Sequence, residues 1–192
     1  RLDHDDIALP ERFAIQYRFM EDHPNIDVVG SWTECIDNDG KYIKTSRNPT
    51  EPIAIKYEFI FNNVMLHSSI FFRTEKVRSY GGYSSEYIHS EDFEMYTRPQ
   101  KELVCANIPK VLFKLRIHNS SITGSEKTQP TVYANAINIV YRNITKYIEL
   151  TRNDFNDIVK IMIVKKPDKE TSLKNVLKAL SILKNITVSF VN

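Results

Sequence analysis

Apolar side chains recur at the spacing of one helix face in several parts of this chain. In residues 10–22, Phe13, Tyr17 and Met20 form such a face, and Pro24 ends the helix because the residue before a proline avoids helical geometry. The same spacing predicts further helices at residues 52–62, 133–148, 153–164 and 172–184. The predicted apolar faces of the first two of these are Ile53, Tyr57, Ile60 and Phe61, and Tyr133, Ile137, Val140, Ile144 and Ile148.

Strand-like composition occurs in three segments, residues 26–36, 69–73 and 111–117. The first contains Val28 and Val29 and is predicted to be a largely buried strand, which is typical of a mixed α/β sheet. The Asp-Asn-Asp-Gly sequence of residues 37–40 predicts a hairpin turn after it. Gly81-Gly82 predicts a tight turn. Taken alone, these two residues fit equally well a turn whose backbone closely approaches a ligand and an ordinary loop between a helix and a strand.

Composition indicates a folded domain. The chain has 192 residues, of which 42% are hydrophobic and 26% charged, so it can form one domain with a sizeable core and a small appendage. A net charge of +2 gives no support for a nucleic-acid partner. No apolar run reaches the roughly 20 residues that span a bilayer. Cys35 and Cys105 lack metal-ligand spacing, which fits a reducing compartment and no structural zinc.

Three carboxylates, those of Asp3, Asp5 and Asp6, lie within four residues. On an extended segment Asp3 and Asp5 would share a face and act together on one divalent ion. Oxygen ligands at this density suit Mg²⁺ or Mn²⁺, particularly where phosphates complete the coordination. The alternative is a solvated acidic turn that caps the following helix.

A second polar group comes later in the chain. Glu91 and Asp92 are predicted at the start of a short helix, where the helix dipole favours carboxylates, so capping is one interpretation of the pair. His118 follows the strand predicted at residues 111–117, and alternation places Arg116 on the same face. A neutral imidazole can ligate manganese, although a histidine at a strand end more commonly has a surface or packing role.

Taken in order, these motifs resemble family 2 glycosyltransferases, which are inverting enzymes with a GT-A fold. The matching residues are Asp3 and Asp5, Leu9, Pro10 and Arg12, residues 26–31, His67-Ser68-Ser69, Gly81-Gly82-Tyr83, Glu91-Asp92 and Arg116-Ile117-His118. The resemblance covers about residues 1–124, and this ordered recurrence is more specific than any single motif. It implies a mixed sheet flanked by helices.

The resemblance also implies roles for these residues. Asp5, Asp3 and His118 would hold Mn²⁺ or Mg²⁺, and Asp92, beside Glu91, would be the general base. The binding of substrate would involve Asp3, Arg116, His67 and Gly82. The implied reaction is hexosyl transfer from a nucleotide sugar, most often a UDP-sugar, to a carbohydrate or other hydroxyl acceptor, as in the synthesis of cell-surface polysaccharides.

Two features depart from the family pattern. Family members carry a nucleotide-binding segment before the Asp-x-Asp, so the chain is expected to be a fragment that is inactive by itself. Pro99 is expected to end the helix after Asp92 early, while leaving Asp92 in place. Because of these departures, a second interpretation stays open, that of a noncatalytic GT-A-like domain that binds a carbohydrate or a partner. The remaining alternative is an unrelated metal-dependent phosphohydrolase.

The expected organisation is a metal- and acceptor-binding part of a GT-A domain at residues 1–124 and a helical extension at residues 125–192. Lysines accompany the apolar face predicted at residues 172–184, so this helix could contact an acidic membrane surface. Docking on its own domain is the favoured interpretation. The expected location is cytoplasmic, with peripheral contact at the inner face of the membrane allowed but not required.

Overall fold

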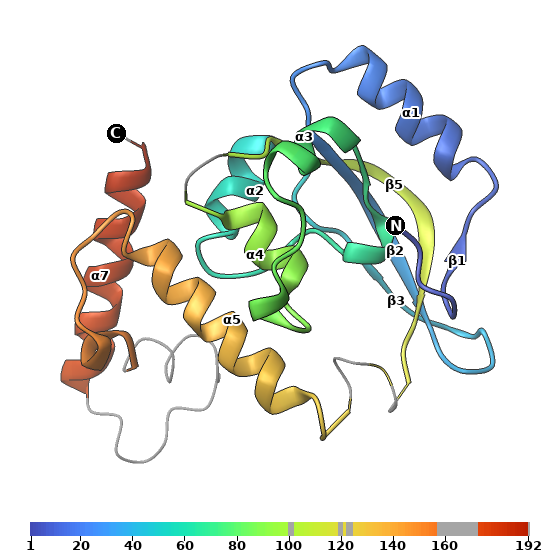
Figure 1. The fold of residues 1–192 in the computed structure, drawn as a ribbon. Coiled ribbons are helices and arrows are strands. Elements are labelled where there is room, and N and C mark those ends of the chain that lie inside the picture. The colour runs from blue at the N-terminus through green and yellow to red at the C-terminus, as the bar shows by residue number, and fades with distance from the viewer. Residues whose placement is uncertain (100–101, 119–120, 122–124, 157–172, 192) are drawn as a thin grey trace. The chain divides into compact units, whose positions relative to one another are not determined.

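The computed structural model describes residues 1–99, 102–118, 121, 125–156 and 173–191. It contains two compact units, Arg1–Ala136 and Ile137–Asn192. The first unit has an α/β architecture and the second is helical (Figure 1). The boundary predicted between residues 124 and 125 adjoins residues outside the described ranges, and it stays a prediction.

A mixed sheet forms the centre of the first unit. Its order is β1-β5-β2-β3, and β4 also pairs with β2. The central strands β2 and β5 are parallel to each other, whereas every other pairing is antiparallel. The strands are β1 (Ile7–Ala8), β2 (Val28–Ile36), β3 (Tyr42–Ser46), β4 (Phe71–Phe72) and β5 (Cys105–Arg116). The predicted mixed α/β sheet is therefore confirmed, as is the buried strand that contains Val28 and Val29.

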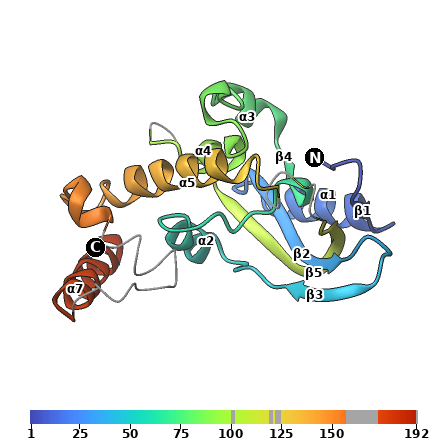
Figure 2. The ribbon, with the colours of Figure 1, turned by 90° about the horizontal axis from the view of Figure 1, so that it is seen from below.

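Helices lie on both sides of these strands, with α1 on one side and α2 and α4 on the other (Figures 1 and 2). The helical elements of this unit are α1 (Arg12–Asp22), α2 (Pro52–Glu58), η1 (His67–Ser69), α3 (Thr74–Ser79), η2 (Ser85–Tyr87), α4 (Glu91–Thr97) and the first part of α5 (Gln129–Ile144). α1 ends before His23-Pro24, and α4 ends two residues before Pro99. Both predicted helix ends are confirmed.

The apolar face predicted for α1 is wrong at Phe13 and Tyr17 and confirmed at Met20. Phe13 and Tyr17 are 52% and 58% exposed, and the buried side of the helix contains Arg12, Gln16 and Met20. Arg12 Nη2 donates to the Ile70 carbonyl at 3.3 Å, and Gln16 Nε2 donates to the Ser69 carbonyl at 2.8 Å. Buried polar groups are tolerated when they are hydrogen-bonded. The bonds to these two carbonyls therefore allow a polar side of α1 to face the sheet. Met20 packs there with Ile26, Val29, Ala106, Ile108 and Leu112.

The second helix, α2 (Pro52–Glu58), also differs from its prediction in its end and in part of its buried face. α2 ends at Glu58 rather than residue 62, and Ile53 is 64% exposed. The buried side chains are Ile55, Phe59 and Ile60. Phe59 stacks on Tyr96 of α4 with ring centroids 5.7 Å apart. Phe59 keeps helical backbone angles at the end of α2, and the consecutive Phe59 and Ile60 both enter the core.

Gly30 of β2 lies against a fixed side chain. Asn107 Nδ2 of β5 donates to the carbonyls of Pro49 at 2.8 Å and Val64 at 3.3 Å. A Cβ atom on Gly30 would lie 2.3 Å from Asn107 Oδ1. We expect Gly30→Ala to lower the free energy of unfolding by about 1–3 kcal/mol, measured by urea denaturation, because this overpacked contact cannot relax without breaking those bonds.

The control for that prediction is Gly30→Ala in an Asn107→Ala background. Removing the amide removes the atom that the new methyl group meets, so the substitution should cost less there than in the native background. An equal cost in both backgrounds would show that the contact with Asn107 is not the cause.

The second unit contains the end of α5, a helical stretch at residues 152–156, and α7 (Leu173–Val191). α5 ends at Ile144 rather than at residue 148, and Tyr133, predicted on its apolar stripe, is 47% exposed. α7 continues past the predicted end at residue 184. Much of the helix predicted at residues 153–164 lies outside the described residues. Among the described residues, no helix combines the length and the hydropathy needed to cross a bilayer.

Candidate active site

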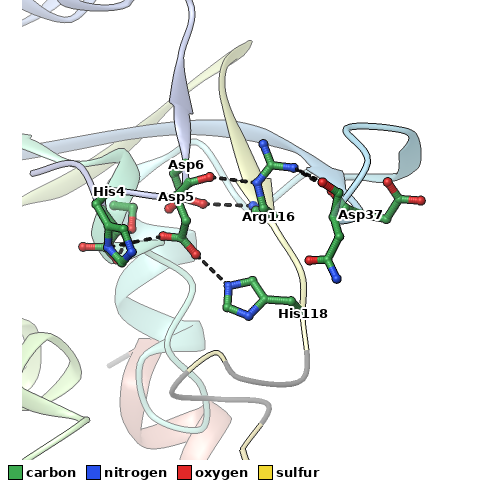
Figure 3. A network of polar contacts seen from close by, with 9 residues as sticks. His4, Asp5, Asp6, Asp37, Arg116 and His118 are labelled. Carbon is green, nitrogen blue, oxygen red and sulfur yellow. Dashed lines mark hydrogen bonds and ion pairs between the residues drawn. The ribbon is translucent and has the colours of Figure 1, made fainter.

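Asp5 and His118 form a close polar pair. Asp5 lies just before β1, whose Ile7 pairs with Lys114 of β5, so the acidic segment lies beside the end of β5. His118 follows β5 by two residues, and its Nε2 donates to Asp5 Oδ2 at 2.7 Å (Figure 3). This hydrogen bond lowers the pKa of Asp5 below its usual value. Antiparallel pairing thus brings together two predicted metal ligands that are 113 residues apart.

Arg116 holds the acidic segment in place. Its backbone N–H donates to Asp6 Oδ1 at 2.9 Å, and its Nε donates to the Asp5 carbonyl at 3.0 Å. Its Nη1 donates to the carbonyls of Asp37 and Asn38 in the β2–β3 hairpin, each at 2.9 Å (Figure 3). The guanidinium therefore ties the acidic segment to the hairpin. Its role in binding substrate stays a prediction.

The acidic segment is a turn, so the expected extended geometry is wrong. The Asp6 N–H donates to the Asp3 carbonyl at 3.3 Å, which folds the segment back on itself. The carboxylates of Asp3 and Asp5 consequently have different partners. Asp3 Oδ2 accepts from Ser68 Oγ at 2.6 Å. Its other oxygen pairs with Arg1 Nη2 at 2.8 Å.

Two of the three predicted metal ligands are thus adjacent, and the third faces η1. Within the described ranges, no group of three or more His, Cys, Asp or Glu side chains is arranged to hold a metal ion. The adjacent pair still suits one, because magnesium-type ions are commonly held by one or two protein donors with phosphate oxygens completing the shell. Asp5 and His118 therefore fit a divalent ion that shares a phosphorylated ligand.

Asp92 lies in the first turn of α4, as expected. Its Oδ2 accepts from Asn63 Nδ2 at 2.8 Å. Burial raises the pKa of Asp92, and the nearby His67, the Phe93 N–H and the Asn63 amide oppose that rise. A carboxylate with a raised pKa is a stronger base than an exposed aspartate, which is the property that general-base catalysis requires.

His67 belongs to η1 and interacts electrostatically with Asp92. Its Nε2 is 2.9 Å from the Tyr83 hydroxyl, and the two rings meet edge to face at 5.2 Å. Burial lowers the pKa of His67, so its imidazole is neutral at pH 7, although the Asp92 carboxylate acts in the opposite direction. Ser68, the next residue, is the one that bonds Asp3. Through Ser68 and His67, η1 therefore interacts both with the acidic segment and with Asp92.

The predicted glycine turn is confirmed. Gly81 and Gly82 have φ angles of +86° and +62°, which side-chain-bearing residues rarely adopt. Arg98 of the segment after α4 donates to the carbonyls of Tyr80 and Gly82, and its Nη2 pairs with Glu94 Oε2 at 2.5 Å. The turn that presents Tyr83 to His67 is therefore held by the Glu94–Arg98 pair. Any contact of Gly82 or Glu91 with substrate stays a prediction.

Sequence reasoning did not single out Asn63, Tyr83 or the Glu94–Arg98 pair as parts of the site. Tyr83 stood within the Gly81-Gly82-Tyr83 motif, which was a usable signal. Asn63 had none, since it lies in the loop after α2 and its partner is 29 residues away.

The first unit is thus an α/β protein in which carboxylates and imidazoles gather at the ends and connections of a mixed sheet. The chain is 35% identical to the amylovoran biosynthesis glycosyltransferase AmsE of Erwinia amylovora over 117 residues, 60% of this chain and 43% of the relative. It is 30% identical to the O-antigen biosynthesis glycosyltransferase WbnJ of Escherichia coli over 130 residues, 65% of this chain and 49% of the relative.

A Haemophilus influenzae protein named as a glycosyltransferase is 25% identical over 202 aligned residues, which cover 97% of this chain and 58% of that protein. No family model matches the chain. The chain spans about half the length of these relatives. The similarities support a glycosyltransferase family and a fold of that kind.

Proposed function

We propose that this chain is the metal- and acceptor-binding part of an inverting, metal-dependent glycosyltransferase of family 2 with a GT-A fold. It would act in hexosyl transfer from a nucleotide sugar, most often a UDP-sugar, to the hydroxyl group of a carbohydrate or other acceptor. The observation that carries the proposal is the hydrogen bond of His118 to Asp5, together with the bond of Ser68 to Asp3 and the electrostatic interaction of the next residue, His67, with Asp92. Relatives named for amylovoran and O-antigen biosynthesis favour cell-surface polysaccharide as the product class.

Asp5 and His118 are the residues that would hold the metal ion. Their facing atoms, Oδ2 and Nε2, are both metal donors once the proton between them leaves. An imidazole ligand favours Mn²⁺ over Mg²⁺, which prefers oxygen. When bound, the ion supplies positive charge that offsets the negative charge growing on the departing nucleotide diphosphate.

Asp92 is the proposed general base. It accepts the proton of the acceptor hydroxyl while that oxygen forms a bond to the anomeric carbon and the bond from this carbon to the diphosphate oxygen breaks. Attack from the face opposite the leaving group inverts the configuration. His67, held neutral by its burial and hydrogen-bonded to Tyr83, would orient the acceptor without adding a second positive charge.

The two alternatives are less well supported. A noncatalytic carbohydrate-binding domain would not require the raised pKa that burial gives Asp92. A metal-dependent phosphohydrolase built on the acidic segment predicts that Asp92 lies remote from Asp3. The neighbouring positions of His67 and Ser68, which approach Asp92 and Asp3 respectively, argue against that arrangement.

Calorimetry of UDP binding with and without Mn²⁺ tests the proposal. We expect binding to require Mn²⁺ and to strengthen when a nucleotide-binding segment precedes the chain. Asp5→Ala should weaken it by about 100-fold or more, since a metal contact contributes several kcal/mol. Asp22→Ala, at the exposed end of α1, is the matched control and should leave binding unchanged. Absence of Mn²⁺-dependent binding in every version would favour the noncatalytic or unrelated alternative.

A further inference from the structure

We propose that Asn63 is a positioning residue for Asp92, which holds Asp92 Oδ2 and thereby makes Oδ1 the oxygen that receives the acceptor's proton. This inference rests on the proposed function, because it assigns an atom to the general base. Asn63 lies in the connection between α2 and η1, outside the motifs to which the sequence assigned roles.

The Asn63 side chain is held at both ends. Its Oδ1 accepts from the Met65 backbone N–H at 3.1 Å, and its Nδ2 donates to Asp92 Oδ2 at 2.8 Å. A backbone N–H can only donate, so the amide oxygen must face Met65 and the amide nitrogen must face the carboxylate. The orientation of the amide is therefore fixed by chemistry.

The segment that carries Asn63 is anchored to the sheet. Met65 is 1% exposed, and the Val64 carbonyl accepts from Asn107 of β5. Asn63 itself is solvent-exposed, so replacing it opens no cavity in the core. The exposed side chain of Asn63 thus extends from an anchored backbone segment and bonds one oxygen of Asp92.

Holding one carboxylate oxygen fixes the plane of the whole group. A carboxylate that rotates freely offers either oxygen to the acceptor and must be oriented anew in each turnover, whereas a held one is already oriented. Protonation at Oδ1 leaves the Asn63 bond to Oδ2 intact. Asn63 therefore keeps the base oriented both before and after it takes the proton.

Several groups around Asp92 act on its charge. His67 and the Phe93 N–H favour the ionised carboxylate, as Asn63 does, whereas Glu91 disfavours it. The phenols of Tyr83 and Tyr96 also interact with Asp92. Because the Asn63 amide donates only to the carboxylate oxygen, its removal should raise the pKa of Asp92 further and leave these other groups in place.

Carboxyl carbon NMR of the chain with ¹³C-labelled aspartate tests the contact directly. The Asp92 signal is assigned with Asp92→Asn and followed against pH. We expect its titration midpoint to move to higher pH in Asn63→Ala, and further in Asn63→Asp, which keeps the acceptor for Met65 but replaces the donor by a negative charge. An unchanged midpoint in Asn63→Ala would overturn the inference.

Asn62→Asp is the matched control. It makes the same chemical change at the neighbouring residue, which is also exposed, and should move the Asp92 midpoint much less than Asn63→Asp does. Equal shifts from both variants would mean that added charge, rather than the specific hydrogen bond, controls Asp92. Well-dispersed amide spectra of each variant establish that the fold is retained.

Kinetics of the transferase separate this inference from the proposed function. Asn63→Ala should lower kcat by roughly tenfold to a hundredfold with little change in KM, the loss typical of a mispositioned catalytic group. If Asp92→Asn keeps full turnover, the proposed function fails, and with it the role given to Asn63, whether or not the titration midpoint shifts. If Asp92→Asn abolishes turnover while Asn63→Ala leaves both kcat and the midpoint unchanged, only the inference about Asn63 fails.

Discussion

Replacing Asp92 by asparagine is expected to lower the turnover number by about 100- to 10,000-fold, the usual contribution of a general base. Asparagine has nearly the same shape and keeps an oxygen for the Asn63 amide, but it cannot take the acceptor's proton. The loss should therefore appear in kcat while UDP binding and thermal stability stay close to native. Turnover is measured on the version in which a nucleotide-binding segment precedes the chain, as nucleoside diphosphate released with the best donor and acceptor of a screened panel.

Two parallel variants define what that loss means. Asp22→Asn makes the same change at the exposed end of α1 and should be without effect. Glu91→Gln alters the other predicted carboxylate and should cost less than Asp92→Asn if Asp92 takes the proton. Native turnover in Asp92→Asn would remove Asp92 from the mechanism.

The pH profile of the native protein provides a further check on Asp92. A general base works only when ionised, and burial raises the pKa of Asp92 above its ordinary value. Turnover should consequently fall as the pH decreases through a value above the usual aspartate range, and it should be constant above it. A decline that begins only at an ordinary aspartate pKa would indicate a solvated carboxylate.

Replacing Arg98 by methionine is expected to lower the free energy of unfolding by about 3 kcal/mol, because it removes the cation paired with a buried carboxylate. The side chain of Glu94 is 5% exposed and that of Arg98 is 18% exposed. The same substitution removes the donors to the Tyr80 and Gly82 carbonyls. Urea denaturation followed by circular dichroism measures the change.

An exposed ion pair of the same type supplies the control. Arg78 Nη1 lies 2.9 Å from Glu75 Oε1, and both side chains are more than 70% exposed, so Arg78→Met should cost less than about 1 kcal/mol. Adding Glu94→Gln to Arg98→Met should recover part of the lost stability, because it removes the buried negative charge that Arg98 no longer balances. A loss in Arg98→Met no larger than that in Arg78→Met would show that burial does not strengthen the pair.

Much of the secondary structure was predictable because its causes are local. The apolar run that contains Val28 and Val29 forms β2, and Asp37 caps its own turn by accepting the N–H groups of Asp39 and Lys41. These features depend on residues within a few positions of one another, so a pattern in the sequence is enough to predict them.

The predicted helix faces failed where a polar side chain has a distant partner. Arg12 and Gln16 are fully buried in α1 because they bond carbonyls 58 and 53 residues away. A periodicity argument ranks residues by polarity alone, so it places such side chains in solvent. Ile53, predicted on the apolar face of α2, is 64% exposed, whereas Ile55, Phe59 and Ile60 are buried.

For the site, the amino-acid sequence by itself determined the chemical groups and their order: the acidic segment, the His-Ser-Ser segment, the glycine turn, the Glu-Asp pair and the Arg-x-His. Only the tertiary structure decided their partners. It paired Asp5 with His118, turned Asp3 toward Ser68, and put Asn63 against Asp92. Each of these contacts joins residues 29 to 113 positions apart, so it depends on strand pairing and loop anchoring, which no local pattern of side chains specifies.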